Sequence, residues 1–338
     1  MRLERLITLC LMRHLRAIRP GSSPSAPRLP ILMYHSISDD PEPGVKTYYK
    51  VCTSPVRFAE QMGWLAKAGC KGVTLTEGLA WLQNTDQSQA ASHGACDRKP
   101  GTPKPVAITF DDGFRDFCTA AFPILDRHGF SATMFLATGF VRDNLPPATP
   151  RQAPIPETPI HRRTGVSTSM PAAFANREFL SWTDVANLHQ AGIEFGSHTV
   201  SHPVLRDLAW PEIESEIRRS KSEIEDRLGA PVRSFAHPYA FPKADNGYAR
   251  RLGETLQAAG YDSCVTTMIG RARPGHDPFE LPRLPANSDD DRSLLAAKLA
   301  GDYDWMARAQ LVLKKLKHTA GRFHKETEAV VLRPARNH

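Results

Sequence analysis

The sequence predicts an α/β protein whose strands and helices alternate and close into a barrel. Short apolar runs, which are typical of buried strands, alternate along the chain with segments of helical periodicity. Strand, helix and strand follow one another at βαβ spacing between residues 106 and 137, which indicates a parallel sheet. Of the 338 residues, 41% are hydrophobic, so the chain is long enough for one barrel-sized core.

Apolar runs and helical spacing predict the elements in the first part of the chain. We expect strands at 31–35, 72–75, 106–110 and 131–137, and helices at 55–68, 76–82 and 116–128. Phe58, Met62 and Leu65 recur at helical spacing within the first helix. Thr76 is expected to cap the second helix. Residues 84–104 are polar and lack a period, so a surface loop is expected there.

Residues 142–178 interrupt the alternation of strands and helices. This stretch contains seven prolines and no periodicity. Unstructured segments of this length inside a compact domain are usually functional or disordered. We therefore expect an insertion that borders the active site.

The remaining elements complete the barrel. We expect strands at 193–196, 232–236, 263–267 and 281–284, and helices at 181–188, 210–228 and 248–259. Ser181 or Thr183 is expected to cap the first of these helices. Ile213 and Ile217 lie on one face of the long polar helix, and Gly229 ends it.

The two ends of the chain differ from the barrel in composition. We assign residues 1–30 to a basic extension and a Pro/Ser-rich linker, 31–290 to the barrel, and 291–338 to a basic helical extension. Basic residues near the ends account for much of the net charge of +7. Because no zinc-finger, helix-turn-helix or aromatic-rich RNA-binding pattern accompanies them, solvated tails are favoured over nucleic-acid binding.

Neither a disulfide framework nor a membrane span is predicted. The six cysteines are scattered without a CxxC pair, and we expect them to be free thiols. The apolar run Leu6–Met12 is far shorter than the ~20 residues of a membrane span, and no small-residue cleavage site follows it. With arginines on one side, it fits an amphipathic membrane anchor or, equally, a mobile extension. We expect a cytoplasmic protein with peripheral contact at the inner membrane; a weak secretion signal is the alternative.

Two consecutive carboxylates, Asp111 and Asp112, end the predicted strand 106–110. Because consecutive side chains alternate in direction, one carboxylate can face a metal while the other faces a substrate. Asp-Asp-Gly is also a common turn sequence, so the apolar strand before it matters to this interpretation.

Two histidines four residues apart, His198 and His202, follow another predicted strand. At this spacing both imidazoles can lie on one face of a helical turn and reach one cation. The alternative is a pair of helix N-terminal histidines without a metal. A third strand end carries Pro238, which favours an extended path, and Tyr239, whose N–H can face an oxyanion. Alone, this last segment indicates only a turn.

In this order, these motifs resemble those of the polysaccharide deacetylase family (the NodB-homology domain, carbohydrate esterase family 4). The segments that resemble family motifs are TFDDG at 109–113, SHTVSH at 197–202 and AHPYAFP at 236–242. LMYHSI at 32–37 and the stretch 179–198 also resemble bacterial members. The likeness extends over roughly residues 31 to 286.

The resemblance implies an irregular (β/α)7 barrel of the glycoside hydrolase/deacetylase type and a metal-dependent hydrolase. It implies that Asp112, His198 and His202 bind a divalent metal, most often zinc, with cobalt and nickel as alternatives. Asp111 would be the general base for a metal-bound water that acts as the nucleophile. The Tyr239 N–H and the metal would stabilise the oxyanion. The implied reaction is removal of N-acetyl groups from a sugar or polysaccharide, such as a cell-surface glycan or its precursor.

The sequence departs from the family pattern at two sites. His237 stands where the third motif often carries an arginine that orients the catalytic aspartate. The region 281–287 lacks the Leu-x-His element that often supplies the general acid. His35 is the first candidate for this acid and His237 the second, although either can be a structural histidine. Trp182 can line the pocket or be a core aromatic residue.

Two alternatives to a sugar deacetylase follow. An aromatic-poor site would favour a hydrolase of a non-sugar C–N bond on the same fold. The absent terminal histidine would fit a non-catalytic carbohydrate-binding module with a degenerate site, but the intact residues Asp111, Asp112, His198 and His202 argue against it.

Overall fold

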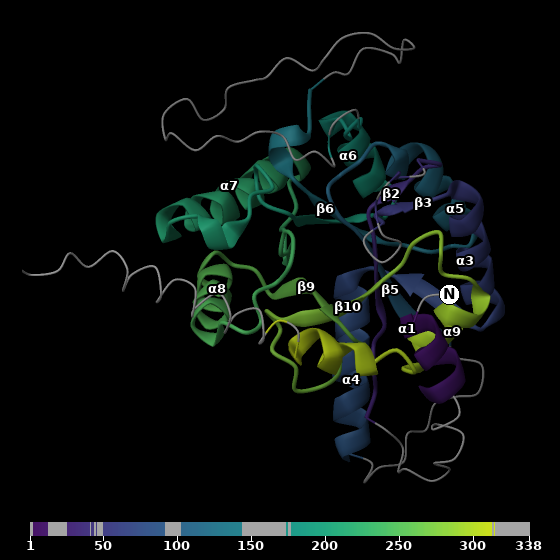
Figure 1. Ribbon diagram of the computed structural model, residues 1–338. Coiled ribbons are helices and arrows are strands. Elements are labelled where there is room, and N and C mark those ends of the chain that lie inside the picture. The colour runs from purple at the N-terminus through teal and green to yellow at the C-terminus, as the bar shows by residue number, and fades with distance from the viewer. Residues whose placement is uncertain are drawn as a thin grey trace, which may run out of the picture.

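Seven parallel strands form a closed barrel in the computed structural model, which describes residues 3–12, 26–40, 42–43, 45, 50–91, 103–143, 174, 177–312 and 314. The ring runs in the order β1 (Ile31–Tyr34), β5 (Lys104–Phe110), β6 (Thr133–Leu136), β7 (Glu194–Ser197), β8 (Ser234–Ala236), β9 (Ser263–Ile269) and β10 (Leu281–Pro285). Helices surround this ring (Figure 1). The predicted irregular (β/α)7 barrel is confirmed.

Strand β1 closes the barrel because it pairs on both sides. Leu32 pairs with Leu284 of β10 and with Ile108 of β5, in parallel in each case. A further strand, β4 (Cys70–Val73), pairs with the first half of β5 and stays outside the ring. β1 and β10 are therefore neighbours in the barrel, although they lie about 250 residues apart in the sequence.

Helices alternate with the strands as expected for βα units, except that β10 follows β9 with no described helix between them. The helices are α3 (Pro55–Lys67), α4 (Leu75–Ala91), α5 (Phe122–Arg127), α6 (Trp182–Gln190), α7 (Trp210–Leu228), α8 (Asn246–Ala258) and α9 (Arg292–Ala300). The π-helical turn η3 (Phe117–Ala121) precedes α5, and the 3-10 turns are η4 (Thr138–Phe140) and η6 (Leu205–Asp207). A small parallel pair, β2 (Ser36–Ile37) and β3 (Cys52–Thr53), follows β1.

Side chains of the strands alternate between the barrel interior and the layer beneath the helices. Ala107 and Phe135 belong to one buried cluster, whereas Ile108 belongs to the larger cluster that includes helical residues. Successive strand residues point to opposite faces, so Thr109 and Asp111 share the interior face with Ala107. The interior is thus apolar at one level and polar where the strands end.

Gly196 of β7 is required by close packing inside the barrel, and we expect Gly196→Ala to destabilise the fold. A Cβ there would lie 2.5 Å from two ring atoms of Phe135 and 2.7 Å from Ser234 Oγ. Overpacking of this kind costs about 1–3 kcal/mol. Urea denaturation measures the change in the free energy of unfolding.

The matched control for this prediction is Gly63→Ala in α3. A Cβ at Gly63 would have no atom within 4 Å, and alanine favours a helix interior by roughly 0.5–1 kcal/mol. The two substitutions should therefore change stability in opposite directions. Equal stability of the Gly196 variant and the wild type would contradict the packing described for the barrel.

Helix α4 differs from its prediction at both ends. It begins at Leu75 and continues to Ala91, so residues 84–91, predicted as loop, are helical. The cap is Thr74 and not Thr76: Thr74 Oγ1 accepts the Glu77 N–H at 3.1 Å, and Glu77 Oε2 accepts the Thr74 N–H at 3.0 Å. The second half of the helix projects from the barrel (Figure 1). It has no apolar stripe in its sequence, so no helical periodicity marked it.

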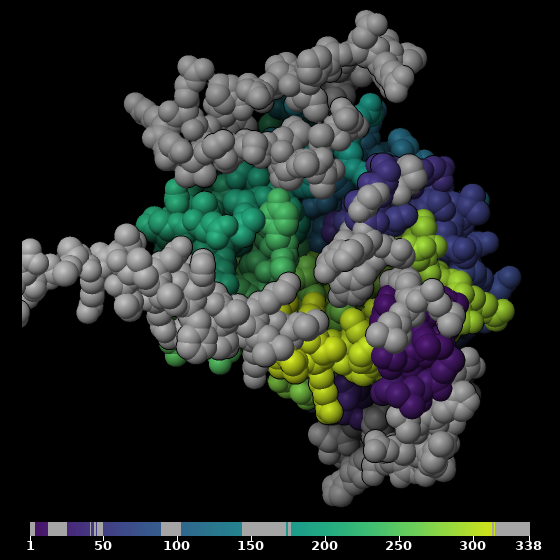
Figure 2. Space-filling model, viewed as in Figure 1, coloured from purple at the N-terminus to yellow at the C-terminus, as the bar shows by residue number. Residues whose placement is uncertain are grey.

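The N-terminal turns α1 (Leu3–Leu6) and η1 (Ile7–Met12) pack beside α9, as Figure 2 shows for the purple and yellow segments. Arg5 Nη2 lies 2.6 Å from Asp291 Oδ2, and Trp305 Nε1 donates to Thr8 Oγ1 at 3.1 Å. Leu6 and Leu11 remain exposed. Among the described helices, none is both long and apolar enough to cross a membrane.

The cysteines of the described residues are free thiols, as predicted; Cys96 lies outside these residues. Most of the predicted insertion 142–178 and of the extension 291–338 also lies outside them. Of the insertion, Arg142, Asp143, Phe174, Arg177 and Glu178 are described.

Candidate active site

The residues singled out in the sequence gather at the carboxyl ends of the barrel strands. Asp111 and Asp112 follow β5, and the segment His198–His202 follows β7. The segment His237–Tyr239 follows β8, and His35 follows β1. This end of an α/β barrel is where the loops that carry catalytic residues meet.

Asp112, His198 and His202 form a cluster with the geometry of a metal site. One potential ligand atom from each lies within 4.8 Å of the others, and all three residues are buried. Asp112 Oδ1 is 3.4 Å from His198 Nε2 and 3.3 Å from His202 Nε2. One carboxylate and two imidazoles are a common donor set for a divalent metal with open coordination positions.

The protonation of this cluster fits metal binding. Burial raises the pKa of Asp112, but hydrogen bonds from the two imidazoles outweigh it, so the pKa lies well below its usual value. Burial lowers the pKa of His202, which favours the neutral ring. For His198, burial also lowers the pKa, but the hydrogen bond to Asp112 and the charge of Asp111 raise it overall. A cation would displace that proton, because ligating imidazoles are neutral.

Four residues of the site adopt the left-handed backbone conformation that non-glycine residues rarely adopt. They are Asp112 (φ 77°), Thr199 (φ 70°), His202 (φ 52°) and Tyr239 (φ 55°). Each such residue costs of order 1–3 kcal/mol and persists only where its surroundings fix it. The strain therefore coincides with the strand ends that carry the candidate catalytic residues.

Arg283 of β10 holds Asp111 in a buried ion pair. Its Nη1 lies 2.7 Å from Asp111 Oδ1 and its Nη2 2.7 Å from Asp111 Oδ2, and Nη1 also donates to Thr109 Oγ1 at 3.2 Å. Burial raises the pKa of Asp111, but the charge and hydrogen bonds of Arg283, together with the charges of His198 and His35, outweigh it and keep the pKa below its usual value. Asp111 is therefore an ionised carboxylate with a fixed orientation.

A model of the polysaccharide deacetylase family matches residues 98–263. The matched region includes the strand end at Asp111–Asp112, the histidine pair and the segment His237–Tyr239. The chain contains a polysaccharide deacetylase domain. This domain identifies the protein as an enzyme of the deacetylase class, as its motifs predicted.

Sequence relatives of this deacetylase include proteins of Bacillus subtilis and Escherichia coli. It is 27% identical over 260 residues to YxkH of Bacillus subtilis, whose name includes the term polysaccharide deacetylase. This match covers 76% of this chain and 71% of YxkH. The chain is 25% identical over 267 residues to the poly-β-1,6-N-acetyl-D-glucosamine N-deacetylase of Escherichia coli strain K12, with 71% of this chain covered. The match spans only 34% of the E. coli enzyme.

Several solved structures share the deacetylase barrel. A Streptococcus pyogenes deacetylase, PplD, solved in complex with acetate, superposes with a TM-score of 0.56 at 22% identity over 81% of this chain and 99% of that one. IcaB from Ammonifex degensii superposes with a TM-score of 0.55 at 22% identity over 80% of this chain and 97% of that one. At this identity the likeness concerns the fold.

Arg283 contacts Asp111 in this deacetylase, whereas the family motif often carries its arginine before the Pro-Tyr pair. His237 occupies the motif position, and the guanidinium beside Asp111 comes from β10, two strands away from β8 in the ring. The available sequence signal was a single arginine inside the apolar strand Leu281–Pro285. Its partner could not be identified from the sequence, because Asp111 lies 172 positions away.

The two candidates for the general acid have different surroundings. His35 Nε2 lies 3.9 Å from Asp111 Oδ2, and its side chain is 21% exposed. His237 is buried, and neither of its ring nitrogens has a hydrogen-bond partner among the described residues. Burial lowers the pKa of His237 to about 3, so its ring is neutral at physiological pH. These observations favour His35 over His237 as the general acid.

Tyr239 borders the metal cluster. Its ring centroid lies 4.5 Å from that of His202, and the residue is 42% exposed. The Tyr239 N–H donates to no atom of the described residues, while its carbonyl accepts a hydrogen bond from Thr267. The positive φ of Tyr239 follows directly after Pro238. This backbone N–H is thus free for a ligand.

The contacts of Trp182 are those of a core-packing residue. It begins α6, packs against the core and lies beneath the Arg227 guanidinium at 5.2 Å. Of the two residues predicted to cap this helix, Ser181 is the cap, and it forms a capping box with Asp184. No described contact joins Trp182 to the carboxylates or imidazoles of the site. Phe174, by contrast, comes from the insertion, and its ring lies 4.9 Å from that of His202.

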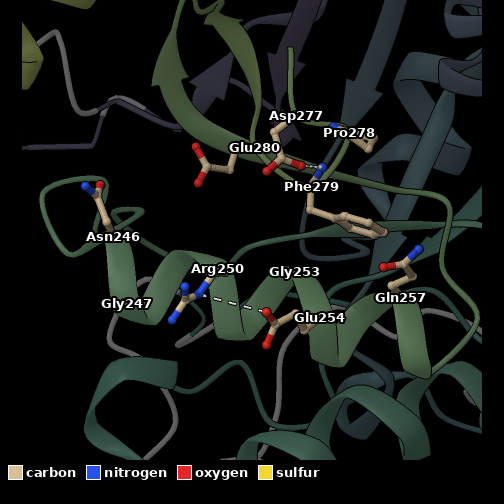
Figure 3. A pocket seen from close by; sticks show the side chains of 10 residues that line it. All are labelled: Asn246, Gly247, Arg250, Gly253, Glu254, Gln257, Asp277, Pro278, Phe279 and Glu280. Carbon is tan, nitrogen blue, oxygen red and sulfur yellow. Dashed lines mark hydrogen bonds and ion pairs between the residues drawn. The ribbon is translucent and has the colours of Figure 1, made fainter. Parts of the chain in front are cut away.

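One cavity of about 670 Å³ lies away from the metal cluster (Figure 3). It is lined by one side of α8, including Arg250 and Glu254, and by the segment Asp277–Glu280 that precedes β10. This segment is at the amino end of its strand, whereas the metal cluster is at the carboxyl ends. The cavity and the site are therefore separate features.

Proposed function

We propose that this deacetylase is a divalent-metal-dependent hydrolase that removes N-acetyl groups from a β-linked N-acetylglucosamine glycan. The observation that carries the proposal is the buried Asp112–His198–His202 cluster beside the Asp111 carboxylate that Arg283 orients. The activity named for the E. coli relative supports the choice of sugar.

Aromatic side chains around the cluster favour a sugar over a non-sugar amide. The exposed ring of Tyr239 lies beside His202, and the buried ring of Phe174 backs the same imidazole. Aromatic faces pack against the apolar faces of sugar rings, and a polar edge on tyrosine suits a site that is partly wet. The site is therefore not aromatic-poor, which is what the non-sugar alternative required.

The residues of the cluster fit a bound divalent metal, for which zinc is our first choice. His198 Nδ1 lies 2.7 Å from the Ala236 carbonyl oxygen, so this nitrogen carries the proton and Nε2 presents a lone pair. A bound cation would replace the His198 proton as the positive charge beside the buried, ionised Asp112. When bound, a divalent cation supplies a Lewis acid that polarises the acetyl carbonyl and makes water more acidic.

In the proposed reaction, Asp111 accepts a proton from the attacking water. Its ionised state and its fixed orientation, both of which Arg283 supports, suit this role. The Tyr239 N–H donates a hydrogen bond to the oxyanion that develops on the acetyl group. His35 donates a proton to the sugar nitrogen as the C–N bond breaks. The products are a free amino sugar and acetate.

We expect His35→Gln to lower kcat for an N-acetyl sugar by about 10²–10⁴-fold, because an amine leaving group must be protonated. The loss should be much smaller for an aryl acetate ester, whose leaving group needs no proton. Measurement of kcat for both substrates separates loss of the acid from general damage. His128→Gln, at an exposed helix end, is the matched control and should leave both rates unchanged. Equal losses for amide and ester would contradict the assignment.

Acetate release from N-acetylglucosamine oligomers tests the proposed function. Protein reconstituted with zinc, cobalt or nickel is assayed on β-1,6- and β-1,4-linked oligomers, beside metal-free protein. We expect release only with metal and faster release from one linkage. Binding of metal without release from any oligomer would overturn the proposed substrate class.

A further inference from the structure

We propose that Glu216 of α7 is a positioning residue that fixes the metal ligand His202 through the backbone of the loop 198–202. The inference rests on the proposed metal site and assigns a role to a residue outside the family motifs. A buried carboxylate, two strained residues and an unpartnered imidazole nitrogen carry it.

The two histidines of the cluster are held in different ways. His198 Nδ1 donates to the Ala236 carbonyl oxygen at 2.7 Å, and this bond orients the ring. His202 Nδ1 is buried, yet it has no hydrogen-bond partner among the described residues. Its neighbours are the aromatic rings of Phe174 and Tyr239. Ligating histidines are usually oriented by a hydrogen bond from their second nitrogen. His202 therefore depends on its backbone for its position.

Glu216 supplies that backbone support. Its Oε2 accepts the Val200 N–H at 2.8 Å and the Ser201 N–H at 2.9 Å, and its Oε1 accepts the Ser201 hydroxyl at 2.9 Å. Glu216 is buried, with an exposure of 7%. Two consecutive N–H groups next to His202 are thereby fixed to α7.

The loop needs this support because its backbone is strained. Thr199 and His202 both have positive φ, and the His202 N–H donates to Thr199 Oγ1 at 3.0 Å. On the opposite side, Gly139 N donates to the Val200 carbonyl at 2.8 Å. Without the carboxylate, one side of the loop would lose its hydrogen bonds, and the strained residues could relax.

The position of α7 itself does not depend on Glu216. Ser220, one turn further along α7, lies 2.6 Å from Ser197 of β7 through their hydroxyl oxygens. Ile213, Ile217 and Ile224 are fully buried in the core. Loss of the carboxylate should therefore act on the loop 198–202 and leave the helix in place.

Metal titration of three Glu216 variants tests the proposal. The affinity for zinc is measured by competition with a chromophoric chelator, and the d–d spectrum of the cobalt form reports the ligand geometry. We expect Glu216→Leu to weaken zinc binding by about 10–100-fold and to change the cobalt spectrum. Glu216→Gln should stay within a few-fold of wild type, because an amide can still accept both N–H groups and donate to Ser201. Glu223→Gln, an exposed pair with Arg219 on the same helix, is the matched control.

Glu216→Asp covers the case in which the leucine variant does not fold. It keeps the charge but shortens the side chain, so we expect weaker zinc binding and an altered cobalt spectrum in a folded protein. Wild-type zinc affinity and cobalt spectrum in the folded Leu or Asp variant would overturn the positioning role. Absence of zinc binding in the wild type would instead contradict the proposed metal site itself.

Discussion

Asp111→Asn is expected to lower kcat for acetate release by about 10²–10⁴-fold while the affinity for zinc stays within a few-fold of wild type. The amide keeps the shape of the side chain but cannot accept a proton from water. Asp111 is not a member of the metal cluster, and its two oxygens face Arg283. Zinc titration and steady-state kinetics on the same preparation measure both quantities.

Asp112→Asn is the matched control for this prediction. It is the adjacent carboxylate, and its Oδ1 lies 3.3–3.4 Å from both imidazoles. We expect this variant to lose most of its zinc affinity, and activity with it, at zinc concentrations that saturate the wild type. The proposed division of roles would be refuted by an Asp111 variant that loses its metal and an Asp112 variant that keeps it.

Arg283→Met is expected to have the second large effect, on both stability and the pH dependence of activity. Removal of one partner of a buried ion pair typically costs about 3–5 kcal/mol, because a buried charge is left unpaired. Arg283 and Asp111 are both almost fully buried. Urea denaturation at pH 7 should therefore show a large loss in the free energy of unfolding.

The sign of the pH effect follows from the pKa of Asp111. In the wild type the pKa of Asp111 is lowered, and the carboxylate is ionised at any pH above that value. Activity that needs Asp111 as a base is therefore lost only when the pH falls through this low pKa. Without Arg283, burial raises the pKa. The acid limb of kcat/KM should therefore move to higher pH, and the loss of stability should shrink as the pH falls and Asp111 is protonated.

Arg233→Met is the control for this arginine. Its ion pair with Asp262 is largely exposed, with side-chain exposures of 57% and 63%. Exposed pairs contribute about 0–1 kcal/mol, so neither stability nor the pH profile should change much. An unshifted acid limb in a folded Arg283 variant would show that Arg283 does not set the ionisation of Asp111.

Local signals in the sequence predicted much of the fold. Helix α7 begins at Trp210 and ends at Leu228 as expected, because isoleucines line one face and Gly229 adopts the left-handed conformation that stops it. Helix α4 was predicted too short, because its second half has no apolar face to mark it. The register that closes the barrel between β1 and β10 also has no local signal.

The site was predictable where chemistry is local to a strand end. The cluster of Asp112, His198 and His202 follows from two short motifs. The supports of these residues were not predictable, because they come from distant elements: Arg283 from β10 and Glu216 from α7. The choice between His35 and His237 depended on burial, which the sequence does not give for a single histidine.

Zinc titration of the metal-free protein tests the central claim most directly. We expect a single zinc ion per chain, bound with high affinity in the wild type and lost in a folded His202→Ala variant. Restored zinc should also restore acetate release from N-acetylglucosamine oligomers in the wild type. A wild-type protein that binds no zinc, cobalt or nickel, or whose bound metal is unaffected by His202→Ala, would contradict the account.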